Sequence, residues 1–186
     1  MKKFTRTRGE CGASGFTLVE LMVTVAVLAI VVGIGAPDLM QMIQRQAVAS
    51  AMQTLTADLR FPRSEALKRG VIIELCGASL TTNNSTTTYS CVSTPSSGSR
   101  SNWLANGWIV RDTQTGDVLR VSQHPLGVGG LDSSRASLPF LPTGLLQGVA
   151  ANVLATPLSA SNTSALQLAC INSTGRTRIV KGSQSC

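Results

Sequence analysis

Two hydrophobic patterns follow one another in the part of the chain that ends at Gly70. Residues 17–36 are almost continuously apolar, and this is the length of a membrane-spanning helix. From residue 38 onward, apolar residues recur with a period of about 3.6, which indicates an amphipathic helix. The repeating positions are Leu39, Met40, Ile43, Ala47, Val48, Ala51, Met52, Leu55 and Leu59. Gly70 follows two basic residues and predicts the end of this helix.

Together the two patterns predict one long helix, with an apolar half at 16–37 and an amphipathic half at 38–70. Pro37 kinks a helix without necessarily ending it, and Pro62 is a second interruption. At 1.5 Å per residue this helix is roughly 80 Å long. Because no compact domain can bury that length, the first half must lie in lipid or against other subunits.

The remaining residues, 71–186, are rich in Ser, Thr, Asn and Gly and predict short strands with many turns. Strands are expected at VIIELC, LPFLPTGLL, ALQLACIN and RTRIVK, and a hairpin where GWIVRD and DVLRVS flank a glycine-containing turn. Loops are expected at the polar segments GASLTTNNSTTTYSC and VSTPSSGSRSN. The chain is therefore predicted to be α+β, with the long N-terminal helix packed on a small antiparallel β domain.

The formal net charge is +7, from 16 basic and 9 acidic residues, and it is unevenly distributed. Residues 1–15 carry four basic residues against one acidic residue, and the rest of the chain is only mildly basic. A basic flank before an apolar span stays in the cytoplasm, so the β domain is expected on the other side of the membrane. An anionic partner would have to bind at a local cluster of basic residues.

The sequence offers no pattern for catalysis or for a metal site. His124 is the single histidine and is expected in a turn, and no nucleophile–His–acid arrangement can be assembled around it. No CxxC or Cys/His spacing typical of a metal site occurs. We therefore expect a protein that is not an enzyme and that needs no cofactor.

Five cysteines divide into one in the basic leader, Cys11, and four later in the chain. Four cysteines allow three connectivities. The local pairs Cys76–Cys91 and Cys170–Cys186 are favoured because each disulfide would close a short loop, and four reduced, buried thiols are the alternative. The membrane segment favours disulfides, since it indicates export to an oxidising compartment.

The apolar run begins with GFTLVE at residues 15–20, directly after the basic leader. This arrangement resembles the prepilin signature of type IV pilins and type II secretion pseudopilins. The resemblance implies that a prepilin peptidase cleaves between Gly15 and Phe16, which removes residues 1–15, and that Phe16 is then N-methylated. It also implies that residues 16–37 cross the inner membrane and later form the core of a filament.

Glu20 is the one carboxylate inside the apolar run. At the centre of a membrane helix a carboxylate costs about 2.5–3.5 kcal/mol, but Glu20 lies one turn from the new amino terminus, where the cost is lower. In a filament Glu20 can face the positive Phe16 amine of a neighbouring subunit and help to set the axial register. The alternative is a glutamate at the membrane edge that extends into water.

Several later segments resemble the GspH/FimT group of minor pseudopilins. They are RSEALKRG at residues 63–70, the strand that ends in Cys76, GWIVRDTQTG and LPFLPTG. The group consists of sparse subunits at or near the tip of a filament. The resemblance implies a pilin-like fold for residues 16–186, with 71–186 as the β-rich domain.

Near the C-terminus, Gly175-Arg176-Thr177-Arg178 matches the GRxR motif of FimT-type subunits, which this resemblance ties to DNA binding in natural transformation. Residues two apart on a strand share a face about 6.6 Å apart, so Arg176 and Arg178 are expected to project together. Lys181 is near enough to extend the patch, and such cations bind phosphates without reading base sequence. Gly175 permits a tight turn or a close approach to phosphate. The alternative is a solvated basic strand edge.

The motifs leave two functions open. The first is a FimT-like minor pilin of a type IV pilus that assists assembly and binds DNA for uptake. The second is a GspH-like pseudopilin of type II secretion, a structural tip subunit without DNA binding. In both cases the expected partners are other pilin or pseudopilin subunits, the prepilin peptidase and the bacterial inner membrane, with a single pass and a periplasmic C-terminal domain.

Overall fold

The computed structural model describes residues 15–83, 86–92, 101–123, 125–159, 161–182 and 185–186. The leader up to residue 14, with Cys11, the segment 93–100 and the predicted turn residue His124 lie outside the described residues. Contacts divide the chain into two units, Met1–Leu39 and Met40–Cys186. Each unit is described by itself below.

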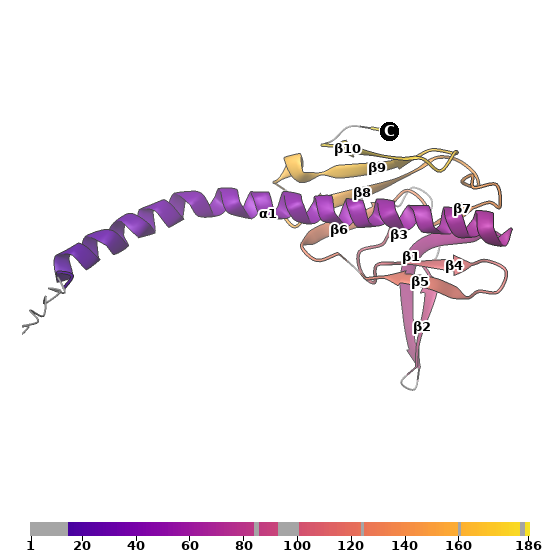
Figure 1. The fold of residues 1–186 in the computed structure, drawn as a ribbon, viewed down its shortest axis with the longest axis horizontal. Coiled ribbons are helices and arrows are strands. Elements are labelled where there is room, and N and C mark those ends of the chain that lie inside the picture. The colour runs from indigo at the N-terminus through magenta and orange to yellow at the C-terminus, as the bar shows by residue number, and fades with distance from the viewer. Residues whose placement is uncertain (1–14, 84–85, 93–100, 124, 160, 183–184) are drawn as a thin grey trace, which may run out of the picture. The chain divides into compact units, whose positions relative to one another are not determined.

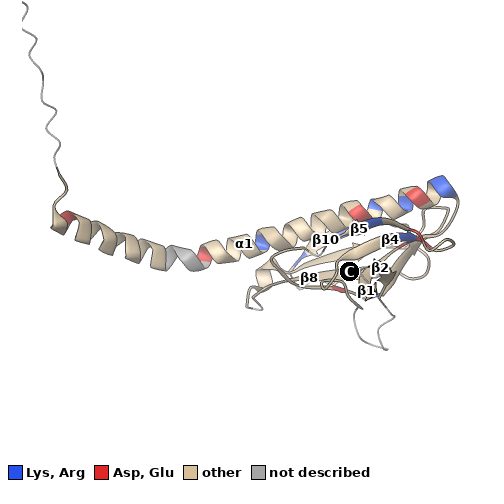
Figure 2. Cartoon of the chain, turned by 90° about the horizontal axis from the view of Figure 1, so that it is seen from below, with Lys and Arg blue, Asp and Glu red and all other residues tan. Residues whose placement is uncertain are grey.

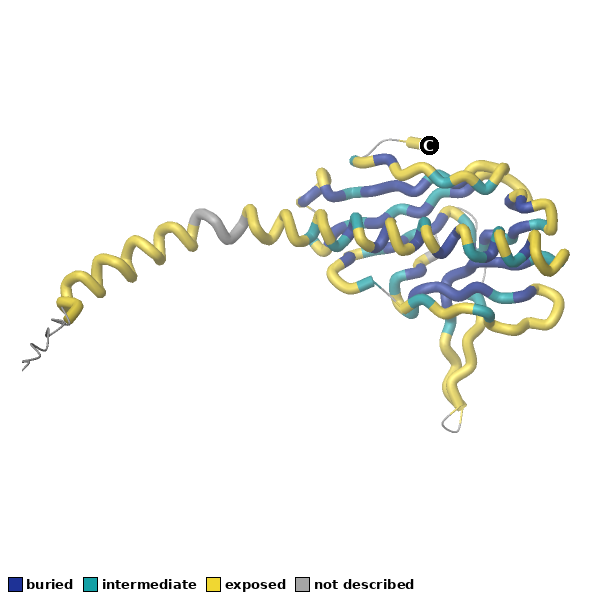
Figure 3. The backbone as a smooth tube through the Cα atoms, viewed as in Figure 1, coloured by how far each residue is buried: buried dark blue, intermediate teal, exposed yellow. Residues whose placement is uncertain are grey.

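Helix α1, Leu18–Arg69, is the single long helix that the sequence predicted. It begins after Thr17, whose Oγ1 accepts a hydrogen bond from Glu20 N at 3.2 Å. This is the contact of an N-cap residue, which satisfies a backbone N–H that has no partner within the helix. In the first unit, the described side chains of α1 up to Gly33 are all exposed (Figure 3).

The second unit contains two antiparallel sheets beside the later part of α1 (Figure 1). The first sheet has the order β2-β1-β4-β5. Strand β7 pairs with the first half of β1, along the edge opposite β4. Its strands are β1 Ile73–Asn83, β2 Thr86–Cys91, β4 Trp108–Asp112, β5 Val118–Ser122 and β7 Ser137–Phe140. The hairpin predicted around the TQTG turn is β4–β5, with Ile109 opposite Val121.

The segment GASLTTNNSTTTYSC, predicted to be a loop, instead forms the β1–β2 hairpin, so that prediction was wrong. Its outer arms are exposed on both faces, and hydrophobic alternation could not reveal them. Threonine, however, is β-branched and favours extended backbone. In the hairpin Thr81 lies opposite Thr88 and Thr82 opposite Thr87, and such cross-strand pairs stabilise a two-stranded ribbon.

The second sheet has the order β10-β9-β8-β6-β3. Its strands are β3 Ser101–Asn102, β6 Val128–Ser133, β8 Ala151–Pro157, β9 Gln167–Ile171 and β10 Thr177–Lys181, and the short 3-10 helix η1 Thr163–Ala165 precedes β9. Strands β3, β6 and β8 were not predicted, and β3 lies at the end of VSTPSSGSRSN, which was predicted to be a loop. The glycines of β6 suggest a turn in the sequence, but a Cβ atom on Gly129 would overlap Pro157 O of β8, so glycine here permits close strand approach.

The core lies where α1 packs on both sheets within the second unit. The amphipathic stripe supplies its helical side with Val48, Ala51, Met52, Leu55, Leu59 and Ala66. Leu39, Met40 and Ile43 share the periodicity but are exposed. The buried hydrophobic residues of the described chain run from Val48 to Val180, so residues 38–186 carry the core.

We expect Gly77→Ala to lower the free energy of unfolding by about 1–3 kcal/mol, because it overpacks a closed site. A Cβ atom on Gly77 would overlap Cδ1 of Trp103, which is 1% exposed and has no room to move. Urea denaturation of residues 38–186 measures the change. Ser79→Ala, two residues along the same strand, is the control, and equal stability of the two variants would contradict this packing.

Candidate functional site

The Gly175–Arg178 segment begins in a tight turn and continues into β10. Asn172 organises the turn, because its Oδ1 accepts hydrogen bonds from Arg176 N and from Thr174 Oγ1, each at 2.8 Å. Backbone hydrogen bonds join Asn172 N to Arg176 O at 3.1 Å and Gly175 N to Asn172 O at 2.9 Å. The turn is therefore held in shape by its own contacts.

Gly175 is required by the packing of this turn. Its φ of +73° lies in the left-handed region, which favours glycine. A Cβ atom at this position would lie 3.2 Å from both Gly144 O and Phe140 Cε1. Glycine therefore lets the turn pack closely against β7 and the turn that follows β7.

Arg176 and Arg178 are both exposed and line one hollow of about 560 Å³. The motif was predicted to lie on a strand, but β10 begins at Thr177 and Arg176 precedes it in the turn. Asn172, Cys170 and Cys186 line the same hollow. The two guanidinium groups therefore share one concave, solvent-accessible surface at the edge of the second sheet.

The disulfide Cys170–Cys186 borders this hollow, with its Cα atoms 5.6 Å apart. Cys170 lies directly opposite Arg178 in the pairing of β9 with β10. The disulfide ties the residues after β10 to β9. This crosslink limits the conformations open to the surface that carries Arg178.

Lys181 lies on the other side of β10. It is three residues from Arg178, and successive side chains on a strand alternate between faces. It shares a side with Thr177 and Ile179, and Ile179 lines a hollow with Gln53, Thr56, Ala57 and Arg60 of α1. Lys181 therefore extends the basic surface on the helix side of the strand, away from Arg178.

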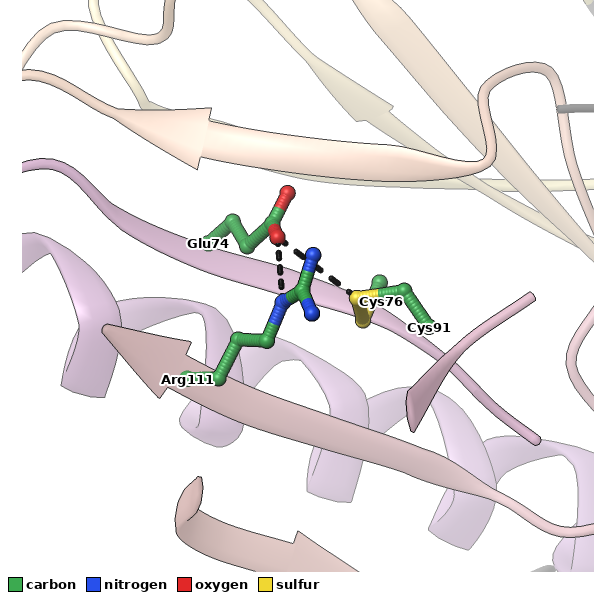
Figure 4. The surroundings of a disulfide bond; sticks show 4 residues. All are labelled: Glu74, Cys76, Cys91 and Arg111. Carbon is green, nitrogen blue, oxygen red and sulfur yellow. Dashed lines mark hydrogen bonds and ion pairs between the residues drawn. A yellow bond between two sulfur atoms is a disulfide. The ribbon is translucent and has the colours of Figure 1, made fainter. Parts of the chain in front are cut away.

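The basic residues of the β4–β5 hairpin are already paired. Arg111 Nε donates a hydrogen bond of 2.5 Å to Glu74 Oε1, beside the disulfide Cys76–Cys91 (Figure 4). Cys91 Sγ lies 3.6 Å from the same oxygen, a contact without a shared hydrogen because the sulfur is in a disulfide. Arg120 Nη2 lies 3.0 Å from Asp58 Oδ1, and Arg120 Cζ lies 5.4 Å from the centroid of the Phe61 ring.

By contrast, the arginines near the Gly175–Arg178 turn make no ion pair with any described carboxylate. They are Arg176 and Arg178, and also Arg60 and Arg63 of α1, which line a second hollow with Arg176. Basic segments along α1 are visible in Figure 2. Arg60 and Arg63 were not predicted as site residues, although a spacing of three on a helix places two side chains on one face.

At the other end of the chain, Gly15 and Phe16 precede α1, and the Phe16 side chain is 80% exposed. Glu20 lies in the first turn of the helix and is exposed. Within the described residues no single helix meets the length and hydropathy of a membrane span. The segments Leu18–Gly33 and Asp38–Arg69 meet them when taken together, by length and composition.

Two families match this chain. Residues 51–184 match the family described as Type II transport protein GspH, and residues 12–36 match the prokaryotic N-terminal methylation motif. The first match covers most of the chain, including the later part of α1 and both sheets. The second covers the whole apolar run, residues 17–36, together with the proposed cleavage position.

The fold is similar to crystal structures of the type IV minor pilin FimU from Pseudomonas aeruginosa strain PAO1. One crystal form matches with 18% identity and a TM-score of 0.53, over 76% of this chain and 96% of that chain. A second crystal form matches with 16% identity and a TM-score of 0.49, over 74% and 98% of the two chains. At this identity the likeness shows a shared pilin-like fold.

The long N-terminal helix, the antiparallel sheets and the methylation motif agree with the family match over most of the chain. The family consists of structural subunits and is not a family of enzymes. This chain therefore belongs to the GspH family and is a minor pilin or pseudopilin of a type IV pilus or a type II secretion system.

Proposed function

We propose that this chain is a minor pilin of a type IV pilus, which helps the filament to assemble and binds DNA for uptake in natural transformation. The observation that carries the proposal is the pair Arg176 and Arg178, which share one hollow and make no ion pair with a described carboxylate. No Asp or Glu follows Asp132 in the sequence, so the local potential is positive.

The contacts of such a site are with phosphates. Guanidinium groups form charge-assisted hydrogen bonds with phosphate oxygens, and these contacts do not distinguish bases. Neither motif arginine stands next to an aromatic residue in sequence, so stacking on bases is not expected. We therefore expect binding that is weak for one subunit, strongly dependent on salt and indifferent to base sequence.

Assembly uses the opposite end of the chain. In the proposed pathway the prepilin peptidase cleaves between Gly15 and Phe16, and Phe16 is N-methylated. Before incorporation, the subunit rests in the inner membrane with its C-terminal domain in the periplasm. Glu20 then meets the Phe16 amine of a neighbouring subunit and helps to set the register of the filament.

A second candidate is a structural tip pseudopilin of type II secretion without DNA binding. The description of the matching family as a type II transport protein favours it. In that case the β domain would contact other tip subunits or exported proteins. Arg176 and Arg178 would then be charges at a solvated strand edge, which prevent pairing with other sheets.

The deciding experiment is DNA binding by residues 38–186 with oxidised cysteines, measured across a salt series. Each phosphate contact adds about 0.9 to the slope of log K against log salt for duplex DNA. We expect the double variant Arg176→Ala with Arg178→Ala to lose about 1.8 of that slope and most of the binding at low salt.

The matched control is Arg45→Ala with Lys68→Ala, which removes the same charge at exposed positions that line neither hollow. Binding by this control should match that of the unmutated fragment. If the unmutated fragment binds no DNA at low salt, the secretion pseudopilin becomes the better account. Equal losses in both double variants would also contradict a specific role for the motif.

A further inference from the structure

We propose that α1 supplies a second phosphate-binding subsite, formed by Arg60 and Arg63 together with Arg176. The inference rests on the proposed function, because its ligand is a phosphodiester of the same nucleic-acid backbone. The three arginines line a hollow of about 230 Å³ between α1 and the Gly175 turn, with Thr56, Leu59, Gly175 and Thr177. The GRxR motif alone does not predict that residues of α1 contribute to phosphate binding.

Arg176 belongs to both hollows, which makes it the link between them. On one side it shares the first hollow with Arg178, and on the other it shares the second with Arg60 and Arg63. A strand of nucleic acid that passes Arg176 therefore meets cations before and after it. The basic surface continues from β10 across the turn to the exposed side of α1.

Arg63 is held in place for this role. Its side chain lies against two turns, since a Cβ atom on Gly144 would be 3.3 Å from Arg63 Nε and one on Gly175 would be 3.6 Å from its Cδ. Arg63 is half-buried, whereas Arg60, one turn earlier, is exposed. Contacts along the stem of Arg63 reduce the rotamer entropy that phosphate binding would otherwise cost.

The carboxylates of α1 that lie nearest in sequence to Arg60 and Arg63 pair with other residues. Asp58 is buried, accepts a hydrogen bond of 2.9 Å from Trp108 Nε1 and pairs with Arg120. Glu65 pairs with Lys68 and Arg69, and its hydrogen bond from Arg69 holds the pKa of this carboxyl below its usual value. The guanidinium groups around the second hollow therefore repel one another until an anion enters.

Nucleic acid fits this surface better than a lipid headgroup. The exposed large apolar residues of α1 in the second unit cluster at its start, at Met40, Met42 and Ile43, and Leu67 is a single one near its end. Arg60 lies about 30 Å along the helix from Met40, at 1.5 Å per residue. A bilayer surface that covered those apolar residues would not reach the second hollow, whereas a nucleic-acid strand bound at Arg178 would reach it through Arg176.

The test compares variants of the full chain in detergent micelles, using a short fluorescein-labelled DNA duplex and a salt series. Four arginines predict a slope of log K against log salt of about −3.6. Arg60→Gln with Arg63→Gln should reduce it to about −1.8 while binding through the motif persists. Arg60→Lys with Arg63→Lys keeps both charges and should retain most of the slope.

Other outcomes separate this inference from the proposed function. If the unmutated chain binds no DNA, the proposed function fails, and this inference fails with it. If DNA binds and the glutamine variant keeps the full slope and the unmutated melting temperature, the second subsite is wrong and the motif stands alone. Arginine-dependent binding to phosphatidylglycerol vesicles, with no such dependence for DNA, would overturn the inference in favour of a lipid ligand.

Discussion

Replacing Asp58 by alanine is expected to lower the free energy of unfolding by about 3 kcal/mol, because it leaves buried donors without an acceptor. Asp58 is 1% exposed, and its Oδ2 accepts hydrogen bonds from Trp108 Nε1 at 2.9 Å and from Ser122 Oγ at 2.5 Å. Trp108 is itself 1% exposed, so its N–H cannot reach water instead. Urea denaturation followed by tryptophan fluorescence measures the loss.

The same carboxylate pairs with Arg120, whose side chain is 48% exposed. After the substitution Arg120 can turn to solvent, so the cost comes mainly from the indole N–H and the hydroxyl of Ser122. The matched control is Glu65→Ala on the same helix. Its ion-pair partners Lys68 and Arg69 are exposed and can turn to solvent, so this substitution should change stability little. Equal stability of Asp58→Ala and Glu65→Ala would show that the buried network contributes nothing.

The outline of the fold follows from hydrophobic periodicity, but Asp58 shows what that periodicity misses. Apolar positions such as Val48, Leu55 and Leu59 repeat every three to four residues, and the same residues line the core. Asp58 lies beside Leu59, and in the sequence it looks like a surface residue. Its acceptor role depends on Trp108 and Ser122, which are distant in the chain and come near only after the sheet has formed.

In the β domain too, some strands could be predicted from the sequence and others could not. The β4–β5 hairpin was predictable, because two β-prone runs flank a glycine-containing turn. The exposed β1–β2 hairpin and the glycine-containing β6 were not, since pairing with a neighbouring strand stabilises them, and single-sequence alternation does not report such pairing. Both disulfides join cysteines that are close in sequence, the arrangement favoured from spacing.

At the candidate site, the sequence located the motif but not its surroundings. Arg176 and Arg178 share a hollow, whereas strand alternation puts Lys181 on the other side of β10. Arg60 and Arg63 join Arg176 because α1 crosses the sheet near the Gly175 turn, and this is a tertiary contact. On α1, Asp58 bonds to β4 and β5, while Arg60, two residues later, lines hollows with β10.

The second large effect is expected at the other end of the helix, where Glu20→Gln should reduce incorporation into filaments by about tenfold or more. The proposed pair joins the Glu20 carboxylate to the Phe16 amine of a neighbouring subunit, and about 1.4 kcal/mol already corresponds to tenfold in an equilibrium. The precursor has an amide at this nitrogen, so the attraction arises only after cleavage. Immunoblots of sheared filaments and of whole cells, compared in the native host, measure the ratio.

The Glu20→Gln substitution removes the negative charge of Glu20 but keeps a side chain that can cap the start of the helix. The pattern of Thr17 followed three residues later by Glu20 is that of a capping box, in which glutamine also serves. Because glutamine can keep the capping contact, the start of the helix should be unchanged and cleavage should proceed in Glu20→Gln. The processed variant should then accumulate in the membrane, because its incorporation into filaments is reduced. Thr24→Ala, one turn further along α1, is the control for a polar change and should be incorporated normally. If Glu20→Gln is cleaved and enters filaments at the unmutated level, the carboxylate plays no part in filament register, and its proximity to the amino terminus reflects only a lower cost of placing a charge at the membrane edge.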